Sequence, residues 1–147
     1  MRLKISDLAR LLKARGIRPS SQRLMVARYI LYAEEHPSAD KVWTEVRKAL
    51  PGISRATVYN TLNLLVSKGL LRRYAVGLSG VVFDANVRDH HHFIEEDSGR
   101  VHDLPWGCVA VSGVDDLRDF EVREYHVVMR GRRMKRPGGG RSPRKPS

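Results

Sequence analysis

The stretch Ser54–Gly69, SRATVYNTLNLLVSKG, decides how the rest of the chain is interpreted. Ser54 is a preferred N-cap residue, and Gly69 suits the left-handed position that closes a helix. An apolar stripe at the spacing i, i+4, i+7 and i+8 lies between them: Val58, Leu62, Leu65 and Val66. Off this stripe lie a cation and three hydrogen-bonding side chains: Arg55, Tyr59, Asn60 and Asn63. The pattern favours a helix that is buried on one side and reads the DNA major groove with the other.

Three further helices and a hairpin are predicted around this stretch. The first helix is capped by Ser6 and ended by Gly16, the second restarts at Pro19-Ser20-Ser21 and runs to about Glu35, and the third lies between Ser38 and Pro51-Gly52. Strands are predicted over 70–76 and 81–85, joined by a turn at 77–80. This order predicts a winged-helix DNA-binding domain over residues 1–85.

The remaining chain predicts a second, smaller unit. Short strands are expected over 90–94, 100–104 and 121–129, with one short helix around 114–118. Such a unit buries little surface alone, so we expect it to pair with a second copy as a homodimer. The fold class is therefore α/β (α+β): a winged helix, a hinge at 86–89, a dimerisation and metal-binding domain over 90–134, and a disordered basic tail over 135–147.

Charge is distributed unevenly along the chain. The net charge is +11, but residues 1–75 carry +10, residues 76–129 carry −7 and residues 130–147 carry +8. A basic first part and an acidic second part suit a protein in which one part meets phosphates and the other meets cations. Cys108 is the only cysteine, which excludes a disulfide within the chain and a cysteine zinc cage. No apolar run is long enough to cross a bilayer, so we expect a cytoplasmic protein with no membrane partner.

Histidines and carboxylates in the second part form a candidate metal site. His90 and His92 fall on one face of a predicted strand, because side chains alternate along a strand. Asp84 lies at the end of the wing, Asp103 on the next predicted strand, and His36 in a loop that could fold over the hairpin. Three imidazoles and two carboxylates without a thiolate favour Fe(II) or Mn(II), with Zn(II) as a further ion that the site could bind in vitro.

Other functions fit parts of this pattern. The histidines could lie in a solvated loop, and the helices could belong to a DNA-binding protein that ignores metals. The same His/Asp set could also serve a non-haem iron enzyme, although the sequence shows no cofactor loop or nucleophile motif.

At the level of motifs, the chain resembles the ferric uptake regulator family of metal-dependent bacterial repressors over most of residues 8–131. The motifs that carry the resemblance are RPSSQR (18–23), HPSAD (36–40), ATVYNTL (56–62), FD (83–84), DHHHF (89–93), SGRVHD (98–103) and FEV (120–122). The resemblance implies a winged helix, an α/β dimerisation domain and a regulatory metal between them. It also implies that a homodimer binds a palindromic operator in double-stranded DNA.

The resemblance assigns roles to residues at matching positions. The metal ligands of the family fall at positions that match His36, Asp84, His90, His92 and Asp103. Residues predicted to contact DNA are Arg18, Gln22, Arg23, Arg55, Thr57, Tyr59 and Asn60.

Two departures from the family pattern concern further metal sites. His91 and His126 match positions of a secondary metal site in some members, but Ala110 stands nearest to the usual acidic partner. Many members hold a structural zinc with two Cys-x-x-Cys pairs, whereas here Glu95 and Ser98 occupy the first pair's positions and 130–135 contains no cysteine. We therefore expect no structural zinc.

Aspartate at position 103 and asparagine at position 60 make the chain resemble the peroxide-sensing branch of the family. Iron-sensing members more often carry glutamate at the position of Asp103. Peroxide reacting with bound iron(II) would oxidise His36 or His90, release the metal and free the DNA-binding domains, whereas manganese(II) would not react readily. An iron-responsive regulator of iron homeostasis, either of the ferric uptake type or haem-linked, is the alternative.

Overall fold

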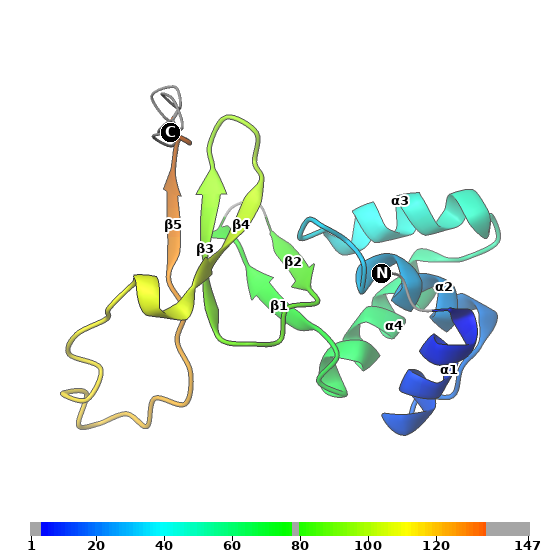
Figure 1. The fold of residues 1–147 in the computed structure, drawn as a ribbon, viewed down its shortest axis with the longest axis horizontal. Helices are drawn as coiled ribbons and strands as arrows, with labels where there is room; N and C mark the ends of the chain where they lie inside the picture. The colour runs from blue at the N-terminus through cyan, green and yellow to red at the C-terminus, as the bar shows by residue number, and fades with distance from the viewer. Residues whose placement is uncertain (1–3, 78–79, 135–147) are drawn as a thin grey trace, which may run out of the picture.

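Four helices, a two-stranded hairpin and a three-stranded sheet follow one another along the chain (Figure 1). The computed structural model describes residues 4–77 and 80–134. The helices are α1 (Ile5–Ala14), α2 (Ser21–Ile30), α3 (Ala39–Ala49) and α4 (Arg55–Ser67). The strands are β1 (Arg72–Ala75), β2 (Val81–Asp84), β3 (His90–Glu95), β4 (Val101–Pro105) and β5 (Val128–Gly131), with a 3-10 turn, η2 (Trp106–Cys108), after β4.

Serine caps begin the three helices α2, α3 and α4. In each, the serine hydroxyl accepts a hydrogen bond from a backbone N–H in the first turn, which satisfies one of the donors that a helix start leaves unpaired. Ser54 Oγ, for example, accepts from the N–H of Thr57 at 3.0 Å. After α4, Gly69 has φ of 70°, a left-handed conformation that glycine adopts without strain. The predicted caps of α3 and α4 are confirmed.

The apolar face of α4 lies in the main core. Val58, Leu62 and Leu65 are at most 1% exposed and pack with residues of α1, α2 and α3, while Val66 is only half-buried at the edge. This burial leaves the opposite face of α4 in solvent. The other three helices therefore hold α4 as predicted, with one side buried and the opposite side exposed to solvent.

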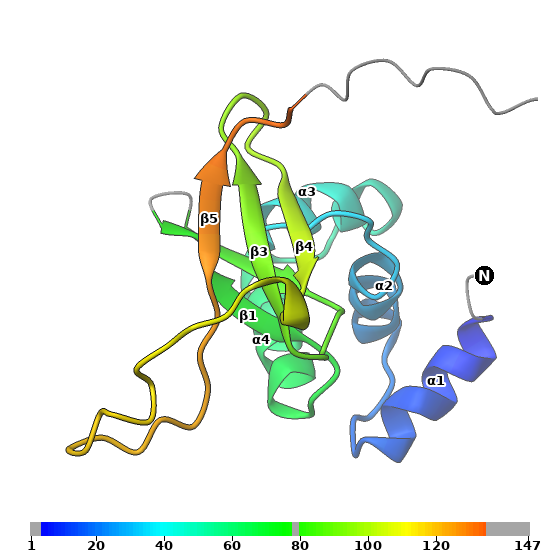
Figure 2. The ribbon, with the colours of Figure 1, turned by 60° about the vertical axis from the view of Figure 1, so that its left-hand side comes forward.

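The wing hairpin of β1 and β2 buries apolar side chains on both of its faces. Phe83 points to the helices and joins their core. Tyr74 and Val82 lie directly opposite one another in the antiparallel register and point the other way, where they form a second apolar cluster with Val76 and Ile94. The wing is thus packed between the helices and the C-terminal sheet (Figure 1; Figure 2 gives a second view).

The prediction of a Ser6 cap for the first helix is wrong. Helix α1 begins at Ile5, and its cap residue is Lys4, which makes no side-chain capping bond. The carbonyl of Lys4 already accepts from the N–H of Leu8 at 3.0 Å. Ser6 therefore lies inside the first turn.

Helix α2 also ends earlier than predicted, at Ile30 instead of about Glu35. The segment between α2 and α3 contacts the wing, because the carbonyl of Pro37 accepts a hydrogen bond from the N–H of Phe83 at 3.0 Å. A tertiary contact overrides the local helical pattern at this point. The strands of the wing are also shorter than predicted, and the predicted turn at 77–80 falls partly on residues outside the described ones.

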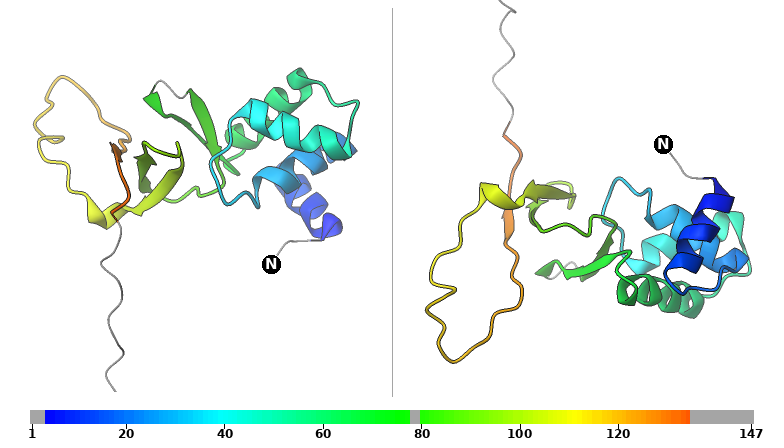
Figure 3. Two further views of the ribbon diagram at one scale, coloured as in Figure 1. Left: turned by 90° about the horizontal axis from the view of Figure 1, so that it is seen from above. Right: turned by 60° about the horizontal axis from the view of Figure 1, so that its bottom comes forward.

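The segment between η2 and β5 contradicts two predictions. No helix forms over 114–118, and of the strand predicted over 121–129 only Val128 onward is paired, parallel to β3. The segment extends away from the sheet (Figure 3) and leaves apolar side chains in solvent, such as Phe120 at 73% exposed. No strand among residues 4–77 and 80–134 lies beside this backbone, so it has no ladder to join there.

Within the described residues, no helix combines the length and the apolar character that a bilayer crossing requires. The tail predicted to be disordered, 135–147, lies outside the described residues.

Candidate metal centre

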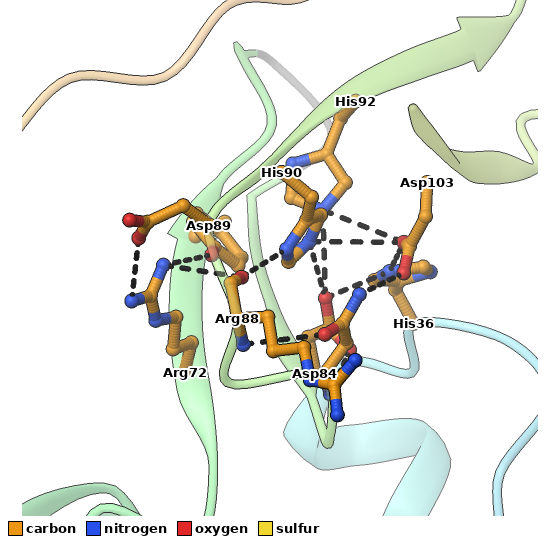
Figure 4. Close-up of polar contacts among 10 residues, drawn as sticks. His36, Arg72, Asp84, Arg88, Asp89, His90, His92 and Asp103 are labelled. Atoms are coloured by element: carbon orange, nitrogen blue, oxygen red, sulfur yellow. Dashed lines mark hydrogen bonds and ion pairs between the residues drawn. The ribbon is translucent and has the colours of Figure 1, made fainter. Parts of the chain in front are cut away.

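Five side chains converge where the wing, the helices and the C-terminal sheet meet (Figure 4). Each offers one nitrogen or oxygen, and these five atoms all lie within 4.8 Å of one another. In residues 4–77 and 80–134 this is the one group of three or more such side chains that could hold a metal ion. Its members are His36, Asp84, His90, His92 and Asp103.

The C-terminal sheet positions three of the five. Alternation along β3 places His90 and His92 on one face, where both are at most 4% exposed. In the antiparallel register of β3 and β4, His92 lies directly opposite Asp103, so the two side chains share that face.

The wing and the α2–α3 loop position the other two. Asp84 ends β2 two residues after Val82, so it points toward the C-terminal sheet as Val82 does, and it is 6% exposed. His36 precedes Pro37, whose carbonyl is bonded to the wing. The Nε2 atom of His36 lies 3.1 Å from Asp84 Oδ2 and 2.7 Å from Asp103 Oδ1.

Hydrogen bonds aim the donors inward. His90 Nδ1 donates to the carbonyl of Arg88 at 2.7 Å, and this bond orients the ring so that Nε2 faces the other donors. That Nε2 lies 2.8 Å from Asp84 Oδ2 and 3.0 Å from His92 Nε2. Imidazole nitrogens and carboxylate oxygens this close together call for positive charge among them, and a metal ion bound by all five groups would supply it. Hard and borderline ions such as Fe(II), Mn(II) and Zn(II) accept this mixture of imidazole and carboxylate.

Ionisation in the cluster follows from its contacts. Burial lowers the pKa of His36, but its hydrogen bond to Asp84 and the charges of Asp84 and Asp103 outweigh this effect and raise the pKa above 6.5. Burial opposes ionisation of Asp84, yet hydrogen bonds from His36, His92 and the N–H of Asn86 hold its pKa well below the usual range. The metal-free cluster therefore has ionised Asp84 beside a readily protonated His36.

We expect metal affinity to fall as the pH decreases through the raised pKa of His36. A metal ligand must be deprotonated, so binding releases the His36 proton. Calorimetric Mn(II) titrations in buffers of different ionisation enthalpy measure this proton release directly. Without metal the sign is reversed: the His36 contribution to folding stability is fully present below pH 6.5 and is lost as the pH rises through the folded-state pKa. Equal affinity and no proton release from about pH 6 to about pH 8 would contradict this expectation.

The two histidines predicted for a secondary metal site do not join the cluster. His91 lies on the opposite face of β3, where Nδ1 accepts from the N–H of Val127 at 3.0 Å and the ring stacks on Trp106 with centroids 4.4 Å apart. His126 packs against Tyr74, with ring centroids 4.8 Å apart. Their role in metal binding stays a prediction.

Two residues at the positions of the missing zinc cysteines contact one another instead. Ser98 Oγ donates to Glu95 Oε2 at 3.0 Å, and His102 Nε2 lies 3.0 Å from the same oxygen. These contacts close the β3–β4 hairpin at its tip.

Most of the predicted DNA-contacting residues line one groove. The groove runs between the start of α2 and the exposed side of α4, and Ser20 and Thr61 also line it. The predicted residues in it are Arg18, Gln22, Arg23, Thr57 and Asn60. Arg23 is held in place, because its Nη1 donates to the carbonyl of Arg18 at 3.0 Å.

Arg55 and Tyr59 lie outside this groove, one helical turn apart on α4. Arg55 stacks on the ring of Trp43 in α3 at 4.4 Å and lies 3.4 Å from Asp40. Tyr59 is 43% exposed. The solvent face of α4 thus extends from a stacked arginine beside α3 to the groove beside α2.

Two residues near the cluster were missed in the sequence. The Tyr74 ring packs edge-on against His92 with centroids 4.5 Å apart, so the wing reaches the cluster through an aromatic side chain as well as through Asp84. Asn86 bonds to both carboxylates. An aspartate followed two residues later by a polar turn residue often signals a side chain that bonds the backbone ahead, and this signal could have identified Asn86.

Four helices, a wing and a His/Asp cluster at the base of that wing define a winged-helix protein with a candidate metal centre at the boundary of its two parts. The model of the ferric uptake regulator family matches residues 14–124. The chain belongs to the ferric uptake regulator family.

Known relatives agree with this assignment. The chain is 34% identical over 122 residues to the peroxide-responsive repressor PerR of Staphylococcus aureus, covering 82% of each protein. It is 35% identical over 129 residues to the protein of the same name from Staphylococcus epidermidis, covering 85% of this chain and 84% of that protein. The family and these relatives place the chain among transcriptional regulators and not among enzymes.

Solved structures share the fold. The Campylobacter jejuni peroxide stress regulator is 26% identical with a TM-score of 0.62, covering 90% of this chain and 98% of that one. The Vibrio cholerae ferric uptake regulator is 19% identical with a TM-score of 0.63, covering 84% of this chain and 98% of that one. At that identity the second comparison supports the fold alone.

Proposed function

We propose that this chain is a metal-dependent, DNA-binding transcriptional repressor that responds to peroxide through one Fe(II) or Mn(II) ion per subunit. The observation that carries the proposal is the convergence of five donor atoms from three separate parts of the chain. Relatives at 34% and 35% identity that are named peroxide-responsive repressors support the response to peroxide.

The five side chains would hold the ion as follows. His36 comes from the helical part, Asp84 from the wing, and His90, His92 and Asp103 from the C-terminal sheet. An ion coordinated by all five side chains would favour one arrangement of the helical part, the wing and the C-terminal sheet. Only that arrangement would fit both half-sites of an operator. Bound iron(II) would supply the redox chemistry with peroxide that manganese(II) lacks, and His36 and His90 are the ligands that we expect to be oxidised.

A homodimer follows from the same proposal. The segment between η2 and β5 exposes Phe120, Leu117 and Val122, which a second copy would cover. The groove and the solvent face of α4 would then be presented twice to a palindromic duplex in the cytoplasm. Glu95, Ser98 and His102 would close the hairpin tip without a structural zinc.

The test compares two metals under peroxide. A DNA site is first selected from a random duplex pool with manganese-loaded protein, and band shifts then follow binding as peroxide is added. We expect iron-loaded protein to release the DNA and manganese-loaded protein to retain it. Mass spectrometry should find added oxygen on His36 or His90 but not on His102, a histidine outside the cluster.

Two results would count against the proposal. If iron-loaded protein retains its DNA after peroxide and gains no oxygen, the protein does not sense peroxide. If DNA binding is the same with and without a chelator, the metal does not control it.

A further inference from the structure

Asn86 connects the two carboxylates of the cluster. It is half-buried and lies two residues after the wing ends, in the segment that connects β2 to β3. Its backbone N–H donates to Asp84 Oδ1 at 2.7 Å, and its side-chain Nδ2 donates to Asp103 Oδ2 at 2.7 Å. One residue therefore bonds to acids that are far apart in the sequence.

The oxygens that Asn86 bonds are the ones that do not face the histidines. Asp84 Oδ2 lies 2.8 Å from His90 Nε2, whereas Asp84 Oδ1 accepts from Asn86. Asp103 Oδ1 lies 2.7 Å from His36 Nε2, whereas Asp103 Oδ2 accepts from Asn86. Each carboxylate thus turns one oxygen toward the imidazoles and the other toward Asn86.

The side chain of Asn86 is itself fixed. Its Oδ1 accepts from the N–H of Arg88 at 3.2 Å, which assigns the amide nitrogen to the Asp103 side. The carbonyl of Arg88 in turn accepts from His90 Nδ1. A continuous set of hydrogen bonds therefore connects Asn86 to Asp84, Asp103 and His90.

We propose that Asn86 is a positioning residue that restricts each carboxylate to one donor oxygen and so leaves room at the metal for one further small ligand. This proposal rests on the proposed function, since it takes the cluster to be a metal site. With one oxygen from each acid, the chain offers five donor atoms, three nitrogens and two oxygens. A carboxylate turns both oxygens to a cation only by giving up its charge-assisted bond to Asn86. Five protein donors leave a place that an ion accepting six can give to peroxide.

The test uses cobalt(II), whose visible absorption reports the number and kind of its ligands, and azide as a small anion that occupies an open position. Asn86→Ala removes the side-chain bond to Asp103 and keeps the backbone bond to Asp84. In the wild-type protein loaded with cobalt(II), we expect azide to shift the visible bands. In Asn86→Ala we expect this shift to be lost, because the freed Asp103 supplies its second oxygen.

Two further variants make the test specific. Asn86→Asp keeps the size and the bond from Arg88 but places a carboxylate against Asp103, so it should lose the azide shift as well. Val87→Ala changes an exposed neighbour in the same connection and should behave as the wild type. Circular dichroism and thermal unfolding establish that each variant is folded, and a role in folding alone would not abolish the azide response.

The outcomes separate the two proposals. An azide shift of wild-type size in both Asn86 variants, or no shift in cobalt-loaded wild type, would overturn the role of Asn86 and leave the metal site intact. If wild-type protein binds neither cobalt(II) nor manganese(II), the proposed function itself fails.

Discussion

A His90→Ala variant is expected to bind Mn(II) more than about 100-fold more weakly than the wild type and to lose metal-dependent DNA binding with it, because loss of a supporting group alone typically costs 10–100-fold. His90 is 4% exposed, and its Nε2 lies within 3.0 Å of both Asp84 Oδ2 and His92 Nε2. Its removal takes away the Nε2 donor, and it breaks the hydrogen bond from Nδ1 to the Arg88 carbonyl in the connection between β2 and β3.

A matched control is His102→Ala. His102 lies on the neighbouring strand and contacts Glu95, outside the five-donor group. Calorimetry with Mn(II) and band shifts with the selected DNA should show wild-type behaviour for this variant. Wild-type Mn(II) affinity in His90→Ala would exclude His90 as a ligand.

The second large effect is expected at the solvent face of α4. Tyr59→Ala or Arg55→Ala should each weaken binding to the selected DNA about 5–150-fold, the range expected for a side chain that reads a base or fixes the helix in the groove. Tyr59 is exposed, and Arg55 is held over the Trp43 ring with its charge at the helix start. Neither side chain lies in the main core, so the fold and the dimer should persist.

Arg47→Ala is the matched control for Arg55→Ala. Arg47 stacks on the same Trp43 ring at 4.5 Å but belongs to α3. It should retain the specific footprint and lose only salt-dependent, sequence-independent affinity. Footprinting on the selected site, with sedimentation to verify the dimer, measures both effects. A wild-type footprint from both α4 variants would show that α4 does not read the DNA.

The helical half of the fold could be predicted from local chemistry. Serine caps, a closing glycine and apolar spacing are all encoded within one helix, and the structure confirms them at Ser38, Ser54 and Gly69. The wrong Ser6 cap is a local error, since Lys4 is the cap residue of α1, whereas other predictions were wrong where a distant segment contributes to the outcome. Helix α2 ends at Ile30, and the chain after it bonds to the wing through the Pro37 carbonyl, a contact that no local pattern contains.

The C-terminal segment shows the same limit more strongly. A strand needs a neighbour, and in this segment only the residues from Val127 onward hydrogen-bond to β3. The residues predicted to form a helix around 114–118 have no packed face within the described chain, and Leu117 is 48% exposed. Apolar character alone therefore could not determine their conformation.

The candidate site could be predicted in its donors but not in its geometry. Alternation places His90 and His92 together, but the register that brings Asp103 opposite His92 is a property of the folded sheet. The role of Asn86 depends on which oxygen of each acid faces inward, and only coordinates show this.

The central claim is that one ion per chain controls the fit of the protein to DNA. The most direct measurement titrates Mn(II) into metal-free protein and follows the bound metal and the affinity for the selected DNA in the same samples. We expect the affinity to rise about 5–150-fold, the usual range for coupling between two sites, and to saturate at one ion per chain. A DNA affinity that stays constant while the site fills would contradict it.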